Sequence, residues 1–321
     1  MKESIRKKLM DFGAVAVGFA EAGNISEEAD RQFQKWIDDG CHGEMGYLHR
    51  HISLRRHPDH VLEGSNTVIS MAFSFQKPQK LSDGRPVVAA YAYGKDYHKV
   101  LRKTLKPLLY EFRELYGGKW RICIDSAPMA ERYWALRSGI GRKGKNGAVI
   151  IDGIGSFCFL AEIVTTVEID PDTPSAEKCM DCGKCIVSCP GNALHGDGTI
   201  DARKCVNYLT IEKTSEFTIE DSRILNSGPG FLFGCDICQR VCPHNYGPAD
   251  AFAGKTLQDF RVNENIRNLT PSHILEMTEE EFKEAFRDSP LLYAGYSRLC
   301  RNARAILTPL KNSDGLMVND K

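Results

Sequence analysis

The twelve cysteines of this 321-residue chain include a run with the spacing of an iron-sulfur cluster loop. The run reads C-x2-C-x2-C-x3-C-P and contains Cys179, Cys182, Cys185 and Cys189. Where two four-iron clusters lie in one domain, the first three thiolates of such a run ligate one cluster and the fourth ligates the other. The run therefore predicts a second cluster and further cysteine ligands elsewhere in the chain.

A second, shorter run supplies most of those ligands. Residues 235–243 repeat the last three cysteines of the motif and its proline, but Leu232 stands where the first cysteine would be. Cys205, between the two runs, is the obvious source of the missing thiolate. We therefore predict two [4Fe-4S] clusters with four ligands each. One set is Cys179, Cys182, Cys185 and Cys242, and the other is Cys189, Cys205, Cys235 and Cys238.

Structural zinc is the alternative use of these cysteines, because C-x2-C pairs also occur in zinc sites. The fused four-cysteine run makes zinc the weaker hypothesis. Of the four remaining cysteines, Cys123 and Cys158 lie in apolar strands and are expected to pack in the core.

The chain shows no apolar run suited to a signal peptide or a membrane span, so we expect a cytoplasmic protein with reduced thiols.

The balanced charge limits how this chain can bind a polyanion such as a nucleic acid. Lysine and arginine together number 42, as do aspartate and glutamate, so the formal net charge is zero. Any contact with nucleic acid must then depend on local basic patches. Residues 42–62 are rich in histidine and arginine without helical periodicity, so they form either a binding loop or an ordinary solvated surface.

The elements that must position these groups can be read from the apolar pattern. Buried strands are predicted at residues 14–19, 67–75, 120–125, 148–152 and 157–169. Helices are predicted at residues 3–12, 26–40, 96–116 and 128–139, with Pro128 in the first turn of the last, and Ser272 is the predicted N-cap of a later helix. The proline-rich segment 170–178 marks a domain boundary.

Two polar residues stand at the ends of these elements. Asp125 closes the strand at 120–125, where α/β proteins often place a reacting group, although Asp125 or Ser126 could instead cap the next helix. His98 lies in the first turn of the helix that begins at Asp96. The helix dipole disfavours an imidazolium there, so a neutral ring that contacts a ligand is expected, and a capping or packing role is the alternative.

The glycine-rich segment 139–147 reads GIGRKGKNG and has neither P-loop nor Rossmann spacing. We expect its glycines to let the backbone approach a ligand closely. Lys143 and Lys145 would then be available to phosphate or carboxamide groups.

Further motifs give the chain a resemblance to the epoxyqueuosine reductase family. In order, they are SLRRHP, YGKDYHKVLR, IDSAPMAER, SGIGRKGKN, FLAEI, the first cysteine run, CVNYLTIE and CDICQRVCPHN, spread over roughly residues 5–305. The cluster loops are shared with many ferredoxins, whereas DYH, D-S-x-P-x-x-E-R and G-I-G-x-x-G-K-N are specific together. The family is cobalamin-dependent, is distantly similar to reductive dehalogenases, and completes queuosine synthesis on tRNA.

The resemblance implies a function for several residues. Asp125 matches the family's proposed proton donor, and burial would have to raise its pKa for it to donate a proton near neutral pH. The residues that the resemblance places around the cobalamin are Arg55, His98, Asp125, Ser126, Gly141, Lys145, Asn146, Val149 and Glu162. The implied partners are a tRNA anticodon stem-loop that carries epoxyqueuosine and an external electron donor. Phosphate contacts are expected from the basic part of 42–62, from Lys143 and Lys145, and from the helix around residues 298–304.

We therefore expect an α+β protein in three parts. Residues 1–170 form an α/β cobalamin-binding domain with a sheet flanked by helices, 171–247 a ferredoxin-like domain with two [4Fe-4S] clusters, and 248–321 a short helical region that is too short for the helical-repeat domain of many family members. No exposed heptad pattern stands out, so a monomer is expected.

Two other functions stay open. A dehalogenase-like reductase of a small molecule would use the same cofactors, although such proteins usually carry an export signal. A ferredoxin-like electron carrier would not need the ~170 residues that precede the clusters.

Overall fold

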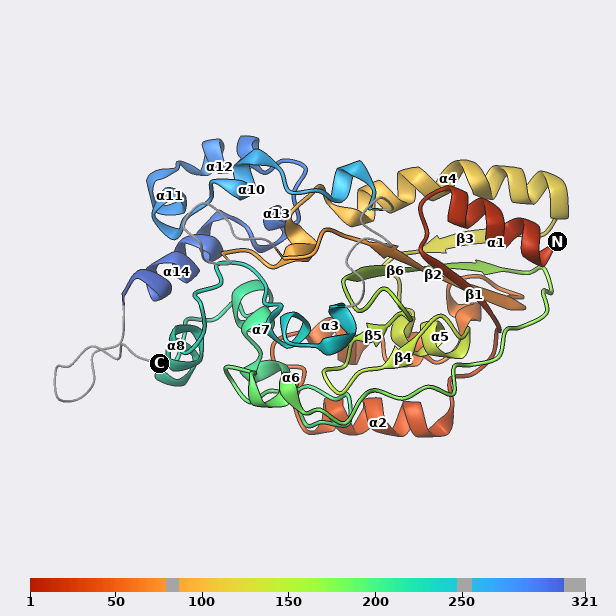
Figure 1. The fold of residues 1–321 in the computed structure, drawn as a ribbon, viewed down its shortest axis with the longest axis horizontal. Helices are drawn as coiled ribbons and strands as arrows, with labels where there is room; N and C mark the ends of the chain where they lie inside the picture. Colours follow the sequence, from red (N-terminus) through yellow and green to blue (C-terminus); the bar gives the residue numbers. More distant parts are fainter. Residues whose placement is uncertain (79–86, 247–255, 309–321) are drawn as a thin grey trace.

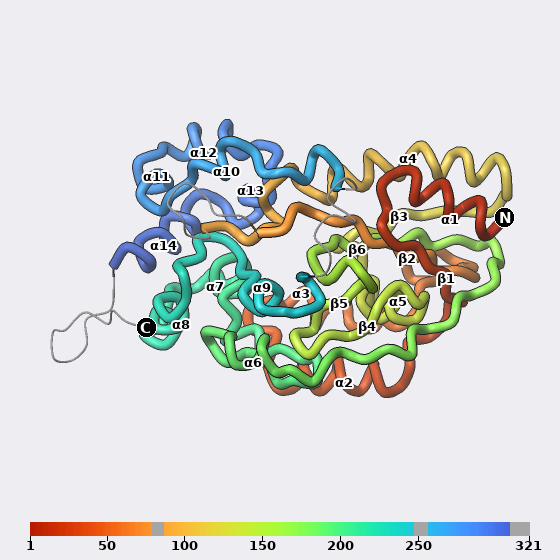
Figure 2. The backbone as a smooth tube through the Cα atoms, in the orientation of Figure 1, coloured from red at the N-terminus to blue at the C-terminus, as the bar shows by residue number. Residues whose placement is uncertain are grey.

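Four antiparallel strands form the sheet on which the rest of the chain packs, in a computed structural model that describes residues 1–78, 87–246 and 256–308 (Figures 1 and 2). The sheet has the order β1-β2-β6-β3. Its strands are β1 (Ala16–Glu21), β2 (Thr67–Ser74), β3 (Trp120–Cys123) and β6 (Cys158–Thr165). A separate hairpin pairs β4 (Arg142–Lys143) with β5 (Val149–Ile150).

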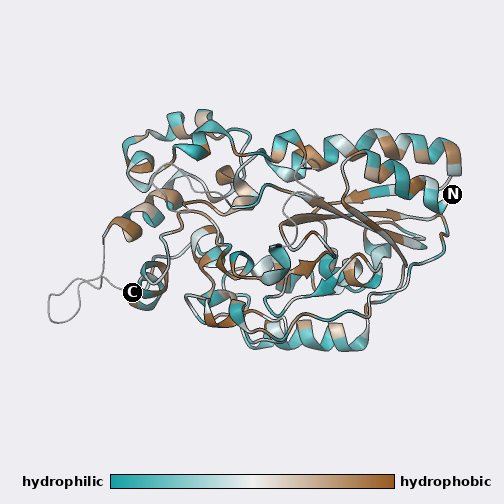
Figure 3. Cartoon of the chain, viewed as in Figure 1, coloured by the Kyte–Doolittle hydropathy of each residue, from teal (hydrophilic) through white to brown (hydrophobic). Residues whose placement is uncertain are grey.

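The apolar strands lie between two layers of helices. On one face, α1 (Lys2–Asp11) and α4 (Tyr97–Tyr116) pack on the sheet, and the other face is covered by α5 (Glu131–Arg137) (Figure 1). β2 is buried at all eight residues, as a continuous apolar run predicts. Figure 3 shows the strands mostly in the hydrophobic colour, whereas α2 (Glu27–Asp38), on the outside, is largely hydrophilic.

A close approach fixes α5 on the sheet. A Cβ atom built on Gly18 of β1 would lie 2.0 Å from the carbonyl oxygen of Ser138, just after α5. Only glycine leaves room for this contact. The buried Trp134 of α5 then packs with Val68 and Val164 of the sheet. The middle and the end of α5 are thereby anchored to the sheet.

The cysteine-rich region consists of short helices joined by loops. Its helices are α6 (Lys184–Val187), α7 (Val206–Ile211), α8 (Ile219–Asn226) and α9 (Ile237–Arg240), with 3-10 turns at Ala202–Lys204 and Pro243–Asn245. Other short elements are α3 (Gly46–Arg50) and the 3-10 turns Ser53–Arg55, Pro58–His60, Ala90–Ala92 and Gln258–Phe260.

Within residues 256–308, five helices follow the cysteine-rich region, and the last two, α13 and α14, pack back onto it. They are α10 (Glu264–Arg267), α11 (Pro271–Glu276), α12 (Glu279–Ala285), α13 (Leu291–Ala294) and α14 (Tyr296–Leu307). The buried amide of Asn302 in α14 donates to the carbonyl oxygens of Thr210 (2.8 Å) and Leu232 (3.0 Å). This pair of bonds ties the last helix to the cysteine-rich region.

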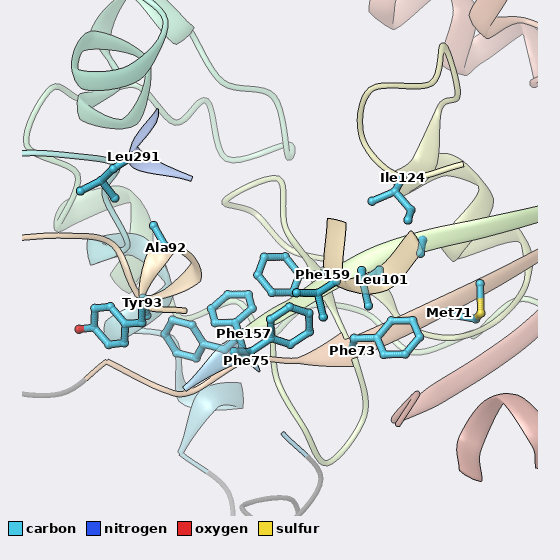
Figure 4. Close-up of a cluster of buried hydrophobic side chains, with 14 of the residues drawn as sticks. Met71, Phe73, Phe75, Ala92, Tyr93, Leu101, Ile124, Phe157, Phe159 and Leu291 are labelled. Atoms are coloured by element: carbon cyan, nitrogen blue, oxygen red, sulfur yellow. The ribbon is translucent and has the colours of Figure 1, made fainter. Parts of the chain in front are cut away.

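One hydrophobic cluster joins all three predicted parts of the chain. It runs from Ile5 through the sheet to Phe233 and on to Ala303, and Figure 4 shows its aromatic centre around Phe75, Phe157 and Phe159. Because these parts share a core, they are expected to fold together rather than as independent units. The predicted boundary at 247/248 falls outside the described residues.

The observed elements correct several details of the sequence-based expectation. The sheet is fully antiparallel, so the rule for parallel α/β sheets does not explain the position of Asp125. α5 begins at Glu131, three residues after Pro128, and Thr270, not Ser272, caps α11. Within the described parts of the chain, no helix combines the length and apolarity needed to cross a bilayer.

Candidate functional site

The first set of predicted cluster ligands surrounds one cavity. Cys179, Cys182, Cys185 and Cys242 all line it, although they come from two segments more than 50 residues apart. In the described residues, no three histidine, cysteine, aspartate or glutamate side chains are arranged to hold a single metal ion. The four thiols are instead spread around a space, as the ligands of a multi-iron cluster must be.

The second set also comes together. Cys238 interacts electrostatically with Cys189 and Cys205, and Cys235 interacts with Cys205 and Cys238. Burial raises the pKa of Cys238 to about 12. Iron binding would have to displace the proton of this thiol, because metal ligation requires the thiolate.

Asp125 lies in a turn between β3 and α5. Its φ angle is 49°, in the left-handed region that residues other than glycine seldom adopt. β3 ends at Cys123, so Asp125 is not the last residue of the strand. Neither Asp125 nor Ser126 caps α5, because the N-cap is Ala130 and makes no side-chain cap bond. The structure thus removes the capping alternative for both residues.

Two side chains converge on the Asp125 carboxylate. The Tyr97 hydroxyl donates to Oδ2 (2.7 Å), and His98 Nε2 lies 3.1 Å from the same oxygen. The other ring nitrogen of His98, Nδ1, lies 2.8 Å from Oδ1 of Asp96. Asp96 also caps α4 by accepting from the backbone amide of His98 (3.0 Å). The result is a chain of hydrogen bonds, Asp96–His98–Asp125, completed by Tyr97.

These contacts set the protonation states of the group. Burial alone would raise the pKa of Asp125, but the hydrogen bonds from His98 and Tyr97 outweigh it and hold that pKa below its usual value. Burial lowers the pKa of His98, whereas its bonds to Asp125 and Asp96 raise it to about 9. At neutral pH the pair is therefore a carboxylate and an imidazolium. Both expectations, a neutral His98 and an Asp125 with a raised pKa, are wrong.

The Glu131 side chain binds the backbone of the Asp125 turn. Its Oε1 accepts a hydrogen bond from the backbone amide of Asp125. Burial, followed by the nearby charge of Asp125, raises the pKa of Glu131 to about 7. Glu131, Asp96 and Tyr97 are absent from the predicted set. The signal for them was available, since they stand in the D-S-x-P-x-x-E-R and DYH motifs.

Glu162 and Arg55 lie next to this group. Glu162 on β6 is 0% exposed, and its burial, with the charges of Glu131 and Asp125, raises its pKa well above normal. Neither of its oxygens has a hydrogen-bond partner among the described residues, nor does Nε of Arg55. Arg55 donates through Nη1 to the carbonyl oxygen of Met129 (2.8 Å). These unpaired polar atoms lie directly around the Asp125 turn.

The predicted residues in the 139–147 loop, and Val149 just after it, do not lie at the Asp125 turn. Lys145 and Asn146 line the cavity of the first cysteine set, and Asn146 hydrogen-bonds Cys238 of the second. Val149 is buried in β5. A Cβ atom at Gly141 would lie 2.6 Å from the carbonyl oxygen of Ile150, so packing within the β4–β5 hairpin, rather than the approach of a ligand, requires this glycine.

Arg132 connects the Asp125 turn with the second cysteine set. This arginine interacts electrostatically with Asp125 and also with Cys205. The Asp125 side chain is still 57% exposed, although enough protein surrounds it to disfavour its charge. Arg132 is thus within electrostatic reach of both Asp125 and Cys205.

Two family models match the chain. The 4Fe-4S double cluster binding domain matches residues 178–245, which include all eight predicted cluster ligands. The model described as epoxyqueuosine reductase QueG, DUF1730, matches residues 55–126, which include Arg55, His98 and Asp125.

Individual proteins are similar over almost the whole chain. An epoxyqueuosine reductase from Cyclobacterium marinum is 35% identical over 302 residues, 93% of this chain and 94% of the relative. A crystal structure of epoxyqueuosine reductase with an epoxyqueuosine-modified tRNA stem loop matches with a TM-score of 0.81 and 26% identity. The Bacillus subtilis epoxyqueuosine reductase, described with its catalytic aspartate loop swung out of the active site, matches with a TM-score of 0.79 and 27% identity. Each structural match covers 95% of this chain and 80% of the other.

Proposed function

This chain belongs to the epoxyqueuosine reductase family, and from that premise we propose that it reduces epoxyqueuosine to queuosine at the wobble position of tRNA. The observation that carries the proposal is the exposed Asp125 carboxylate, bonded to a protonated His98, with Arg132 within electrostatic reach of both Asp125 and Cys205. The chain is an oxidoreductase with a domain for two [4Fe-4S] clusters.

The reaction needs electrons that side chains cannot supply. Conversion of an epoxide to an alkene with loss of water consumes two electrons and two protons. Iron-sulfur clusters and cobalamin work at sufficiently low potentials. We assign the clusters to the two cysteine sets. Cys182 of the first set is exposed, so that set is the one an external donor reaches, whereas Cys205 of the second lies near the Asp125 turn.

We propose that cobalamin binds beside Asp125, because buried polar atoms without partners among the described residues gather there. When bound, it would supply the low-potential electrons at the epoxide carbon. Arg55, His98 and Glu162 surround the Asp125 turn, and the buried Arg55 Nε and Glu162 oxygens have no hydrogen-bond partner among the described residues. Ser126 is exposed at the same turn. We propose these four residues as the corrinoid surroundings. Gly141, Lys145, Asn146 and Val149 stay a prediction from the resemblance, since they lie in or beside the β4–β5 hairpin, where Lys145 and Asn146 line the cavity of the first cysteine set.

One of the two protons that the departing oxygen needs is proposed to reach it from Asp125, and the other comes from solvent. The carboxylate is ionised in the resting site, but His98 holds a proton 3.1 Å from its Oδ2. Transfer of that proton along the hydrogen bond makes Asp125 a neutral acid, and Asp96 stabilises the imidazolium from which the proton comes. Tyr97 fixes the carboxylate orientation through Oδ2. We expect the His98–Asp125 pair to act as one titrating unit.

The proposed tRNA contact uses only some of the expected basic residues. Arg298 and Arg301 of α14 donate to backbone carbonyl oxygens of residues 209–215, so they stabilise the fold. Residues 49–51 and Lys143 are exposed and remain candidates for phosphate contacts. A cytoplasmic monomer that takes electrons from an external donor stays a prediction.

An anaerobic conversion assay tests the proposed function. Reconstituted protein receives epoxyqueuosine-containing tRNA and a strong chemical reductant, with or without cobalamin, and the nucleosides are analysed by mass spectrometry. Conversion to queuosine only with cobalamin is the expected result. No conversion, despite intact clusters and bound cobalamin, would contradict the proposal and favour a dehalogenase-like reductase of a small molecule. Conversion without cobalamin would show that the reaction does not require that cofactor.

A further inference from the structure

The conformation of the Asp125 turn needs a partner that holds it. Asp125 is one of two described residues other than glycine with a positive φ, and such a conformation costs of order 1 kcal/mol or more. Its carboxylate makes bonds to Tyr97 and His98, which lie on a different element. Among the described residues, its backbone amide donates to the Glu131 carboxylate alone. The hydrogen bond to Glu131 therefore connects the Asp125 turn to α5.

The position of Glu131 on α5 makes it a rigid anchor. It is the first residue of the helix, and three residues later Trp134 is 2% exposed and packed on the sheet. The glutamate does not cap its own helix, because its carboxylate reaches back six residues to Asp125. A structural role in α5 alone would not require this contact.

The charges around Glu131 come from every element packed against it. Arg55 and Arg132 stabilise its charged form, whereas burial and the carboxylate of Asp125 oppose it. Glu162 on β6 also interacts with Glu131, as do the ionisable groups Tyr97 on α4 and Cys123 on β3. These opposing influences leave Glu131 with a pKa of about 7.

We propose that Glu131 is a positioning residue, whose carboxylate holds the Asp125 turn so that Oδ2 meets Tyr97 and His98. The bond to the backbone amide is charge-assisted when Glu131 is ionised and is weaker when Glu131 is neutral. The turn is therefore held more firmly as the pH rises through about 7. The meaning of this for catalysis rests on the proposed function, whereas the bond itself does not.

Amide hydrogen exchange tests the bond directly, without turnover. The cluster-reconstituted protein is compared with Glu131→Ala, Glu131→Gln and the control Asp221→Asn. Asp221 in α8 is also a buried carboxylate that accepts from a backbone amide, that of Thr218 (2.7 Å). We expect the Asp125 amide to exchange about tenfold faster in Glu131→Ala, and within about threefold of the wild type in Glu131→Gln and in the control. Unchanged exchange in Glu131→Ala overturns the proposal.

Kinetics then test the positioning role. Glu131→Ala is expected to lower kcat by about 10- to 100-fold and to change KM for tRNA by less than about threefold. Glu131→Gln keeps an acceptor oxygen but cannot ionise, so its rate should stay near the lower rate that the wild type shows below pH 7, and the ascending limb near pH 7 should be lost. An ascending limb that persists in Glu131→Gln, or a loss confined to KM, contradicts the proposal. This comparison also decides the matter if Glu131→Ala fails to fold.

The two proposals fail in different ways. If the wild type does not convert epoxyqueuosine, the proposed function is wrong, and the exchange of the Asp125 amide still decides whether Glu131 holds the turn. If the wild type is active but the Glu131 variants exchange and turn over normally, only the positioning role is wrong.

Discussion

The bond between Asp96 and His98 makes a specific prediction about pH dependence. In the proposed mechanism, His98 stores the proton, so the rate should fall as the pH rises through its pKa of about 9. Asp96→Asn removes one of the two carboxylates that raise this pKa. Asparagine caps helices about as well as aspartate, so the start of α4 should be preserved.

The size of the shift follows from the strength of the bond. A hydrogen bond to a charged group contributes about 1.5–3 kcal/mol, and one pKa unit corresponds to about 1.4 kcal/mol. Loss of the Asp96 charge should therefore lower the pKa of His98 by about one to two units. Because the His98 side chain is 33% exposed, solvent screening favours the lower value. The descending limb should move from about pH 9 to about pH 8.

Single-turnover rates between pH 6 and 10 would measure this shift without interference from product release. The control is Asp259→Asn, which removes a nearby carboxylate that pairs with Lys95 (2.8 Å). That variant should keep the descending limb at about pH 9. If the limb stays at the same pH in Asp96→Asn, His98 is not the group that stores the proton.

Three further predictions concern the clusters and the stability of the fold. Cys182→Ser should lose about half of the bound iron, whereas Cys300→Ser, outside both cysteine sets, should lose none, as measured by iron analysis; equal iron contents would refute the ligand assignment. Gly18→Ala should lower the free energy of unfolding by about 1–3 kcal/mol because its Cβ meets Ser138, whereas Gly23→Ala has open space and should change it little in denaturant titrations. Glu44, whose pKa is about 2 despite partial desolvation because Ser215 and Thr214 donate to it, should stabilise the protein above pH 4.5 and lose this effect as the pH falls towards 2. Glu44→Gln should then unfold about 1–2 kcal/mol more easily at pH 7, with a difference that shrinks in acid; a constant difference would contradict the linkage.

Apolar patterning predicted the sheet well because its signal is local. The runs at 67–75 and 157–169 correspond to β2 and β6, at the centre of the sheet. Strand direction is not local, so the antiparallel order could not be derived from these runs. The glycines of 139–147 were also ambiguous, since a close contact with a ligand and one with the chain, as at Gly141, demand the same residue.

The ionisation states of the site residues could not be predicted from local sequence rules. The helix dipole predicts a neutral His98, but Asp125, 27 residues along the chain, folds back to its Nε2 and reverses the outcome. Burial does oppose the charge of Asp125, as expected, but the bonds from Tyr97 and His98 are stronger. Both errors arise because the ionisation of a group depends on partners that only the tertiary fold brings together.

The most direct test of the account is the turnover of Asp125→Asn. The variant is loaded with iron and cobalamin, both are verified by analysis and absorption spectra, and conversion of epoxyqueuosine-containing tRNA is followed in a single turnover. The account predicts a loss of at least about 100-fold with cofactor content unchanged, because asparagine cannot deliver the proton held at His98. A variant with both cofactors bound and a normal rate would show that Asp125 is not the proton donor.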